Sequence, residues 1–268
     1  MDSVNNIFGA DISVLDGKVS VRNEAALKTD KMDKLVAAAV FGAKDEKEYA
    51  RWLLWELGQA VGVQPSSIHD LYMARGRGDI GGFTVPAINV RGAAYLTARS
   101  IFRTANRLKA GAFILEIARS EIGYTDQRPA EYVSVMIAAA LREGFRGPLF
   151  IQGDHFQVNA KKWKADPATE VDAVKQLVKE AVAAGFYNID IDTSTLVDLS
   201  QKTLDEQQRP NYETGVDILR AVRQAEPRGT TISAGGEIGE VGTENSTEPE
   251  LRAFMDGFNA SLPAGIGG

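Results

Sequence analysis

The residues with the clearest potential for chemistry follow an apolar run near the middle of the chain. Residues 147–155 read GPLFIQGDH, so a segment of strand character ends in Gly153, Asp154 and His155. A carboxylate and an imidazole at the end of a strand can transfer protons or bind a metal ion, and α/β proteins place their sites there. The alternative is a turn whose polar side chains merely face water, because short motifs also arise by chance.

Polar residues recur at the ends of four other segments of strand character. These segments span residues 83–90, 111–117, 186–192 and 230–237, and stretches of helical periodicity separate them. The polar residues at their ends are Asn89, Glu116, Asp192 with Ser194, and Glu237. A parallel barrel gathers the carboxyl ends of its strands at one mouth, so these side chains could meet there. The alternative is a set of solvated loop residues.

The order of these elements predicts the fold class. Strands that alternate with helices are typical of a parallel sheet, in either a (β/α)8 TIM barrel or an open doubly wound fold. No glycine-rich phosphate motif follows the first strand, which disfavours a dinucleotide-binding fold. We therefore predict an incomplete (β/α)8 TIM barrel of about five βα units over residues 83–268. Residues 1–82 form an N-terminal helical extension in this prediction.

Local signals predict several finer features of the chain. They are a hairpin around Asp16-Gly17, a helix opened by Pro65 and Ser66, a helix over residues 93–109 with Leu96, Ile101 and Leu108 on its inner face, and helix starts at Asp166-Pro167 and at Thr247.

The composition narrows the range of functions. The chain has 268 residues, a formal net charge of −6 and no basic cluster, which argues against a nucleic-acid partner. It has no cysteine, so disulfides and thiolate metal sites are excluded. We find no apolar run long enough to span a membrane and no secretory signal at the N-terminus, so we expect a cytoplasmic protein without a membrane partner.

Four motifs, in chain order, resemble those of the class II, metal-dependent fructose-bisphosphate aldolases. They are residues 86–90 for the family's PAFNV, Asp154-His155 for its DH, residues 191–196 for its IDxSxL, and residues 237–239 for its ExG turn. The resemblance implies a zinc-dependent lyase of carbohydrate metabolism and glycolysis. Such an enzyme cleaves a sugar phosphate, fructose 1,6-bisphosphate, into glyceraldehyde 3-phosphate and dihydroxyacetone phosphate.

The resemblance also implies roles for particular residues. His155 would bind the catalytic zinc, Asp192 and Glu237 would hold a second or alternative divalent cation, Asp154 would relay the proton, and Asn89 and Ser194 would contact the substrate. The residue types suit the reaction. A divalent metal stabilises the negative charge of an enediolate, and a neighbouring carboxylate moves the hydroxyl proton.

The chain departs from the family in its histidines. The family binds its catalytic zinc with three, whereas this sequence contains only His155 and His69, and His69 precedes the first predicted strand. The sequence also ends before strands six to eight of a barrel. We therefore expect the chain alone to bind zinc weakly and to catalyse little. A five-strand piece has unpaired edges, and we expect it to associate as a homo-oligomer.

Two alternatives stay open at this point. One is a barrel enzyme that binds Mg²⁺ through Asp154, Asp192 and Glu237 without further histidines. The other is a non-catalytic scaffold whose helical extension, with Trp52 and Trp55, docks a partner or a second copy. A Schiff-base aldolase is disfavoured because no lysine stands at a predicted strand end.

Overall fold

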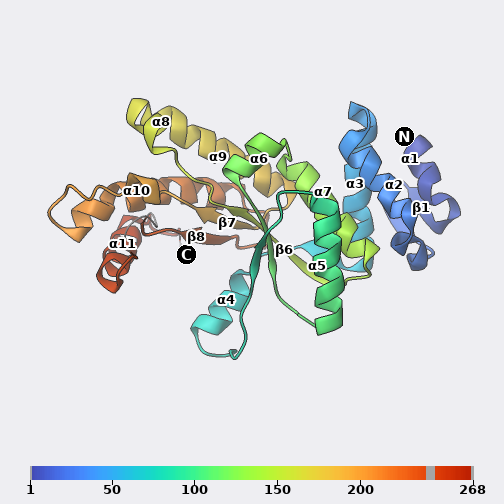
Figure 1. Ribbon diagram of the computed structural model, residues 1–268, viewed down its shortest axis with the longest axis horizontal. Coiled ribbons are helices and arrows are strands. Elements are labelled where there is room, and N and C mark those ends of the chain that lie inside the picture. The colour runs from blue at the N-terminus through green and yellow to red at the C-terminus, as the bar shows by residue number, and fades with distance from the viewer. Residues whose placement is uncertain (1, 240–244, 267–268) are drawn as a thin grey trace. The chain divides into compact units, whose positions relative to one another are not determined.

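The computed structural model describes residues 2–239 and 245–266 and divides into two compact units (Figure 1). The N-terminal unit comprises residues 1–66 and 82–151, and the C-terminal unit comprises residues 67–81 and 152–268. Each contains helices and parallel strand pairs, so the chain has a mixed α/β fold. This division into compact units does not test the predicted boundary between an N-terminal extension and barrel units at residues 82 and 83, which stays a prediction. A closed barrel also stays a prediction.

The N-terminal unit begins with helices and a hairpin. Its first elements are α1 (Asp2–Phe8), β1 (Ile12–Leu15), β2 (Lys18–Val21), α2 (Asp30–Phe41), α3 (Lys44–Val61) and β3 (Val63–Pro65), with short 3₁₀ turns at Gly9–Asp11 and Glu24–Lys28. Strands β1 and β2 pair antiparallel. Asp16 and Gly17 between them have φ angles of 49° and 73°, which a tight hairpin turn requires. The predicted hairpin is confirmed.

Strand β3 was not expected from the sequence. It pairs in parallel with β6 (Gly147–Asp154), with Val63 opposite Gly147 and Pro65 opposite Leu149. The backbone N–H of Ser66 then donates to the carbonyl of Leu149 at 2.8 Å. The predicted helix start at Pro65 is therefore wrong, whereas the helix itself is present as α4 (His69–Gly76) and begins four residues later. A proline is tolerated at the end of such a short strand because its missing N–H is not needed there.

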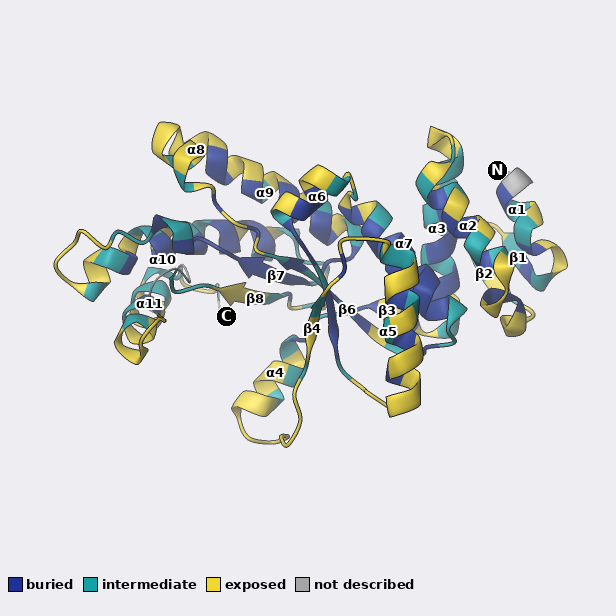
Figure 2. Ribbon diagram, in the orientation of Figure 1, coloured by how far each residue is buried: buried dark blue, intermediate teal, exposed yellow. Residues whose placement is uncertain are grey.

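The rest of the N-terminal unit alternates strands with helices. The elements are β4 (Ala87–Asn89), α5 (Ala94–Leu108), β5 (Ile114–Ala118), α6 (Arg119–Thr125), α7 (Pro129–Arg142) and the first part of β6. Strands β4 and β5 pair in parallel. Helix α7 is buried along most of its length (Figure 2). Beside the sheet, the rings of Phe102, Phe113 and Phe145 pack with centroids 5.0 to 5.8 Å apart.

Helix α5 turns a different face to the core from the one predicted. Leu96 and Leu108 are 61% and 67% exposed and Ile101 is only half-buried, whereas the buried residues are Ala98, Phe102 and Ala105. Two alanines on the inner face let α5 approach α7 closely, and Phe102 fills the remaining space. The pattern of leucines indicated the helix correctly but gave the wrong inner face.

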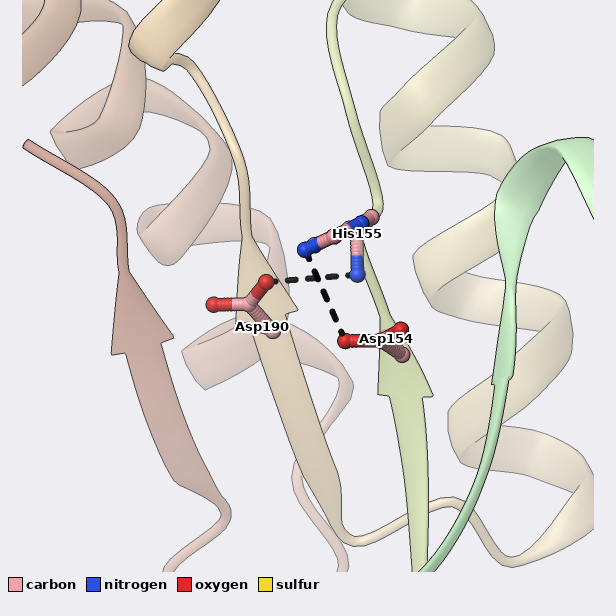
Figure 3. Close-up of side chains that lie close together, drawn as sticks. All are labelled: Asp154, His155 and Asp190. Atoms are coloured by element: carbon pink, nitrogen blue, oxygen red, sulfur yellow. Dashed lines mark hydrogen bonds and ion pairs between the residues drawn. The ribbon is translucent and has the colours of Figure 1, made fainter. Parts of the chain in front are cut away.

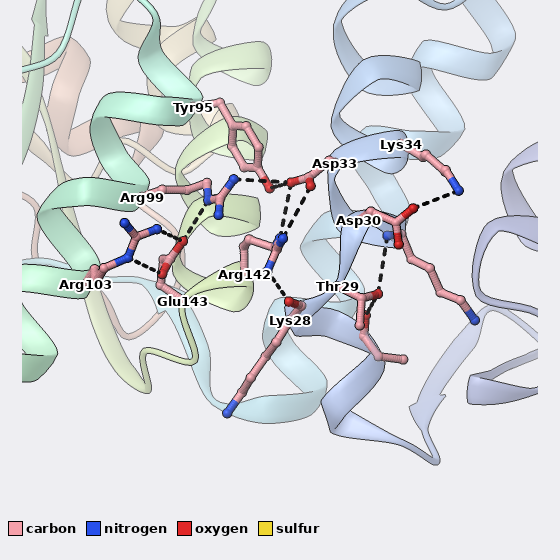
Figure 4. A network of polar contacts seen from close by, with 12 residues as sticks. Lys28, Thr29, Asp30, Asp33, Lys34, Tyr95, Arg99, Arg103, Arg142 and Glu143 are labelled. Atoms are coloured by element: carbon pink, nitrogen blue, oxygen red, sulfur yellow. Dashed lines mark hydrogen bonds and ion pairs between the residues drawn. The ribbon is translucent and has the colours of Figure 1, made fainter.

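A polar network joins three helices of the N-terminal unit (Figure 4). Asp33 on α2 accepts hydrogen bonds from the Tyr95 hydroxyl at 2.7 Å and from Arg142 Nε at 3.2 Å. Glu143 accepts from Arg99 Nε at 2.7 Å and from Arg103. Desolvation raises the pKa of the half-buried Asp33, but its hydrogen bonds and the arginines outweigh this and hold the pKa below its ordinary value. These contacts fix α5 and α7 against α2.

The C-terminal unit contains the last part of β6 and the remaining elements. They are α4 (His69–Gly76), α8 (Ala160–Ala165), α9 (Pro167–Ala184), β7 (Asn188–Ile191), a 3₁₀ turn at Ser194–Leu196, α10 (Leu204–Ala225), β8 (Ser233–Gly236) and α11 (Glu248–Ser261). Strands β6, β7 and β8 are neighbours in that order and run parallel. Helix α10 packs against α9 and α11. The carboxyl ends of the three strands therefore lie at one edge of the sheet.

Two predicted helix starts in this unit are confirmed. Asp166 caps α9 by accepting a hydrogen bond from the backbone of Thr169 at 3.1 Å, and Pro167 occupies the first turn. Thr247 and Glu250 form a capping box at the start of α11. Within the described residues, no helix has both the length and the apolar character needed to cross a membrane.

Candidate metal centre

Three residues of the C-terminal unit bring metal-binding atoms together. Asp154 ends β6, His155 follows it, and Asp190 lies in β7, and one ligand atom from each lies within 4.8 Å of the others (Figure 3). Glu237 directly follows β8, and its Oε1 lies 3.6 Å from His155 Nε2. Three carboxylates from three adjacent strand ends thus surround one imidazole. We refer to Asp154, His155, Asp190 and Glu237 as the metal centre.

The backbone at His155 is held in an unusual conformation. His155 has a φ of 40°, in the left-handed region that non-glycine residues rarely adopt. Its N–H donates to Asp190 Oδ2 at 3.2 Å, and the N–H of Phe156 donates to the carbonyl of Asp190 at 3.0 Å. At Gly153 a Cβ would lie only 2.5 Å from the buried Phe156 ring, so this position requires glycine. The turn therefore directs the imidazole toward β7.

The carboxylates shift the proton affinities of the centre. Partial burial lowers the pKa of His155, but the negative charges of Asp154, Asp192, Asp190 and Glu237 together outweigh it and raise the pKa above its ordinary value. Burial raises the pKa of Asp190 to about 7, and the neighbouring carboxylates add to this shift. Burial and the charge of Asp192 likewise raise the pKa of Glu237. Such an excess of negative charge favours a bound cation.

Asp192 and Ser194, both predicted as site residues, contact each other. Asp192 is 2% exposed, and its Oδ1 accepts hydrogen bonds from the N–H and the hydroxyl of Ser194 at 3.1 and 2.6 Å. Its Oδ2 accepts from Gln157 Nε2 at 2.5 Å. Both carboxylate oxygens are thus already bound by protein donors. The negative charge of Asp192 contributes to raising the pKa values of His155, Asp190 and Glu237. Its predicted role as a metal ligand stays a prediction.

Asn89, predicted to contact substrate, lies in the N-terminal unit at the end of β4. Its Nδ2 donates to Glu121 Oε2 at 2.6 Å, and the same carboxylate accepts from Arg91 at 2.7 Å and from the N–H of Ala118 at 2.9 Å. Burial raises the pKa of Glu121, but these donors outweigh it and lower the pKa below its ordinary value. Asn89 is therefore fixed by an ionised carboxylate.

Sequence reasoning missed Asp190 as a member of the centre. The available signal was the two-residue repeat of a strand, which predicts that Asp190 inside β7 and Asp192 just after it point to the same side of the sheet. Only the observed register, with Gly153 opposite Ile189, brings Asp190 next to His155.

The donor set of the metal centre fits a divalent ion. One imidazole and three carboxylates can supply the nitrogen and oxygen ligands that Zn²⁺ uses, and the carboxylates alone suit Mg²⁺. The side chains of His155 and Glu237 are 53% and 38% exposed, so the centre is open to solvent on one side. The ligands of such an ion would come from Asp154, His155, Asp190 and Glu237, and the open side would admit a small molecule.

Two cavities in the N-terminal unit lie along α5. One, of about 600 Å³, is lined by residues of α2, α5 and α7 that include Tyr95 and Arg99. The other, of about 390 Å³, runs beside β4 and includes Ile88 and Leu108. Neither of these two cavities is lined by a residue of the metal centre. The exposed Leu96 and Leu108 of α5 thus line these two cavities and are not part of the core.

The parallel strands with acidic and imidazole side chains at their carboxyl ends define an α/β protein with a candidate divalent-metal centre. Residues 118–222 match the family model described as "D-tagatose-1,6-bisphosphate aldolase subunit GatZ/KbaZ-like". This aldolase-related match covers less than half of the chain. It includes Asp154, His155, Asp190 and Asp192, whereas Glu237 lies beyond it.

One similar solved structure is the crystal structure of a probable tagatose 6 phosphate kinase from Sinorhizobium meliloti 1021. The identity is 19% and the TM-score is 0.48, over 67% of this chain. The chain spans 45% of the length of that protein. The search of curated proteins found no match.

Proposed function

We propose that this chain takes part in the metal-dependent aldol cleavage and condensation of a ketose 1,6-bisphosphate. The observation that carries the proposal is the match of residues 118–222 to the aldolase subunit family, because that region contains three of the four residues of the metal centre. The family's name makes D-tagatose 1,6-bisphosphate the first substrate to test. Fructose 1,6-bisphosphate, which the sequence motifs suggest, differs from it only in the configuration at one carbon.

The chemistry of aldol cleavage suits the side chains of the centre. A base removes the proton from the C4 hydroxyl, the C3–C4 bond breaks, and its electron pair moves into an enediolate at C2 and C3. When bound, a divalent ion would polarise the C2 carbonyl and stabilise that negative charge. Asp154 is the proposed proton relay. His155, Asp190 and Glu237 are the proposed ligands, and Ser194 and Asn89 stay proposed substrate contacts.

We also propose that the chain works within an assembly. The matched family is described as an aldolase subunit, which supports the expectation of oligomers. The metal centre contains one histidine, whereas the aldolases that the sequence resembles use three, which supports the expectation of low activity for the chain alone.

Zinc binding tests the proposal directly. We expect the purified chain to compete with a chromogenic chelator for Zn²⁺, and His155→Ala to weaken binding by at least tenfold because a ligand is lost. His69→Ala is the matched control, since His69 does not belong to the group of ligand atoms around His155. A wild-type chain that does not bind zinc, or an equal loss in both variants, would contradict the proposal.

Turnover is then measured as the release of dihydroxyacetone phosphate from each of the two bisphosphates. We expect slow, zinc-dependent release that Asp154→Asn abolishes. Release that continues unchanged in Asp154→Asn would remove this residue from the mechanism.

A second candidate is a carboxylate-site enzyme that uses Mg²⁺ or Mn²⁺. The observation that favours it is the excess of carboxylates over imidazole in the metal centre. Here His155→Ala would weaken Mg²⁺ binding much less than it weakens Zn²⁺ binding, so the same variant separates the two candidates.

A further inference from the structure

Helix α10 carries two amide side chains that are almost completely removed from solvent. Gln208 is 1% exposed and Asn211 is 0% exposed, and they lie one helical turn apart. Burial of an amide without partners costs free energy, so such residues are retained in a core only where they make hydrogen bonds. The partners of these two side chains are the backbone that follows β8 and the turn that follows β7.

Hydrogen bonds link the two amides to each other and to the backbone that follows β8. Asn211 Nδ2 donates to the carbonyl of Glu237 at 2.8 Å, and Gln208 Nε2 donates to the carbonyl of Ile238 at 2.7 Å. Asn211 Nδ2 also donates to Gln208 Oε1 at 2.9 Å, which fixes the two amides relative to each other. The carbonyls of Glu237 and Ile238, which directly follow β8, are thereby hydrogen-bonded to side chains of α10.

The same asparagine reaches the turn after β7. The hydroxyl of Thr193 donates to Asn211 Oδ1 at 2.6 Å and approaches the backbone carbonyl of Asn211 at 2.9 Å. Gly215 on the next turn of α10 allows this approach, because a Cβ there would lie 3.3 Å from the Thr193 hydroxyl. Thr193 stands between Asp192 and Ser194, so α10 holds both strand ends that flank the metal centre.

We propose that Asn211 and Gln208 are positioning residues for the metal centre. By holding the carbonyls of Glu237 and Ile238, they fix the backbone from which the Glu237 carboxylate reaches to within 3.6 Å of His155. The inference rests on the proposed function in so far as Glu237 binds the metal. In the contacts described, neither amide touches a side chain of the metal centre, so their effect is transmitted through the backbone.

The first test measures the backbone itself in the metal-free protein. Asn211→Leu and Gln208→Leu keep side chains of similar size but remove the donors. We expect amide hydrogen exchange across residues 237–239 to become at least tenfold faster in both. Leu219→Ala is the matched control, because Leu219 is 1% exposed on the same helix and its truncation destabilises the core without removing these hydrogen bonds.

The second test measures the affinity for zinc by competition with a chelator. Loss of a residue that orients a ligand typically weakens metal binding by about 10- to 100-fold, and we expect a loss of that size in Asn211→Leu and Gln208→Leu but not in Leu219→Ala. Thermal unfolding of all three variants shows how much of any change reflects stability alone. If Asn211→Leu does not fold, Gln208→Leu carries both tests.

The outcomes separate the two proposals. Unchanged exchange at residues 237–239, or equally increased exchange in Leu219→Ala, would overturn the positioning role. Faster exchange together with weaker zinc binding would support it. If the wild-type chain binds no zinc, the proposed metal function fails, and exchange in the metal-free protein still decides whether Asn211 and Gln208 position Glu237.

Discussion

Substitution of Asp190 by asparagine should make the metal-free protein more stable at alkaline pH. Asp190 is 9% exposed, and burial beside other carboxylates raises its pKa from 3.8 to about 7. The unfolded chain therefore loses this proton near pH 4, whereas the folded protein keeps it until about pH 7. The folded pKa is raised, so stability is fully present below the unfolded pKa and is lost as pH rises through the folded one.

The size of the expected stability difference follows from how far the pKa of Asp190 is raised on folding. A difference of about 3 pKa units corresponds to roughly 4 kcal/mol, which is an upper bound on the stability that ionisation of Asp190 removes by about pH 8. The substituted asparagine would carry no charge, and its carbonyl oxygen can still accept the hydrogen bond from the N–H of His155 that Asp190 now accepts. We expect Asp190→Asn to gain about 1 to 4 kcal/mol over wild type at about pH 8 and little at about pH 4.

Urea unfolding with a chelator present, followed by circular dichroism, measures this difference at several pH values. Asp172→Asn is the matched control, because Asp172 is an exposed carboxylate on α9 of the same unit. The Asp190→Asn variant should also bind zinc more weakly than wild type, since it loses an anionic ligand. A stability difference between Asp190→Asn and wild type that does not change from about pH 4 to about pH 8 would refute the reasoning.

Three further predictions concern other parts of the molecule. Zinc affinity should fall as the pH is lowered through the raised pKa of His155, because His155 must lose a proton to bind the metal; a chelator competition titration against pH checks this. Gly153→Ala should push the buried Phe156 ring away and lower the affinity for zinc by at least tenfold, as measured by the same competition. Asp33→Ala should destabilise the N-terminal unit by about 1 to 3 kcal/mol in urea unfolding, because Tyr95 loses its acceptor.

Local signals in the sequence were sufficient for much of the fold. Helix starts at Asp166 and Thr247 depend on hydrogen bonds within a few residues, and the hairpin at Asp16-Gly17 depends on two backbone conformations. Alternation of strands and helices indicated parallel pairing, because a parallel connection needs a crossover. Strand β3 could not be predicted in this way, because its pairing partner lies more than 80 residues further along the chain.

The candidate site was predicted only in part, for a related reason. Asp154, His155 and Glu237 stand at strand ends, which the pattern of apolar residues reveals. The choice between Asp190 and Asp192 depends on how β7 is aligned with β6, and the register that decides it is a property of the folded sheet. Asn211 carries no motif, and its importance comes from hydrogen bonds to groups 18 and 26 residues away in sequence.

The boundary between the two units falls inside β6, which has a practical consequence for producing either unit separately. The chain passes from one unit to the other after residues 66, 81 and 151, and the last of these passages falls inside β6. No single cleavage point can therefore release either unit, and an expression boundary just before Gln152 would start in the middle of a strand. Insertions, tags and proteolytic sites are better placed in the exposed loop around residues 77–82, where the chain makes no strand.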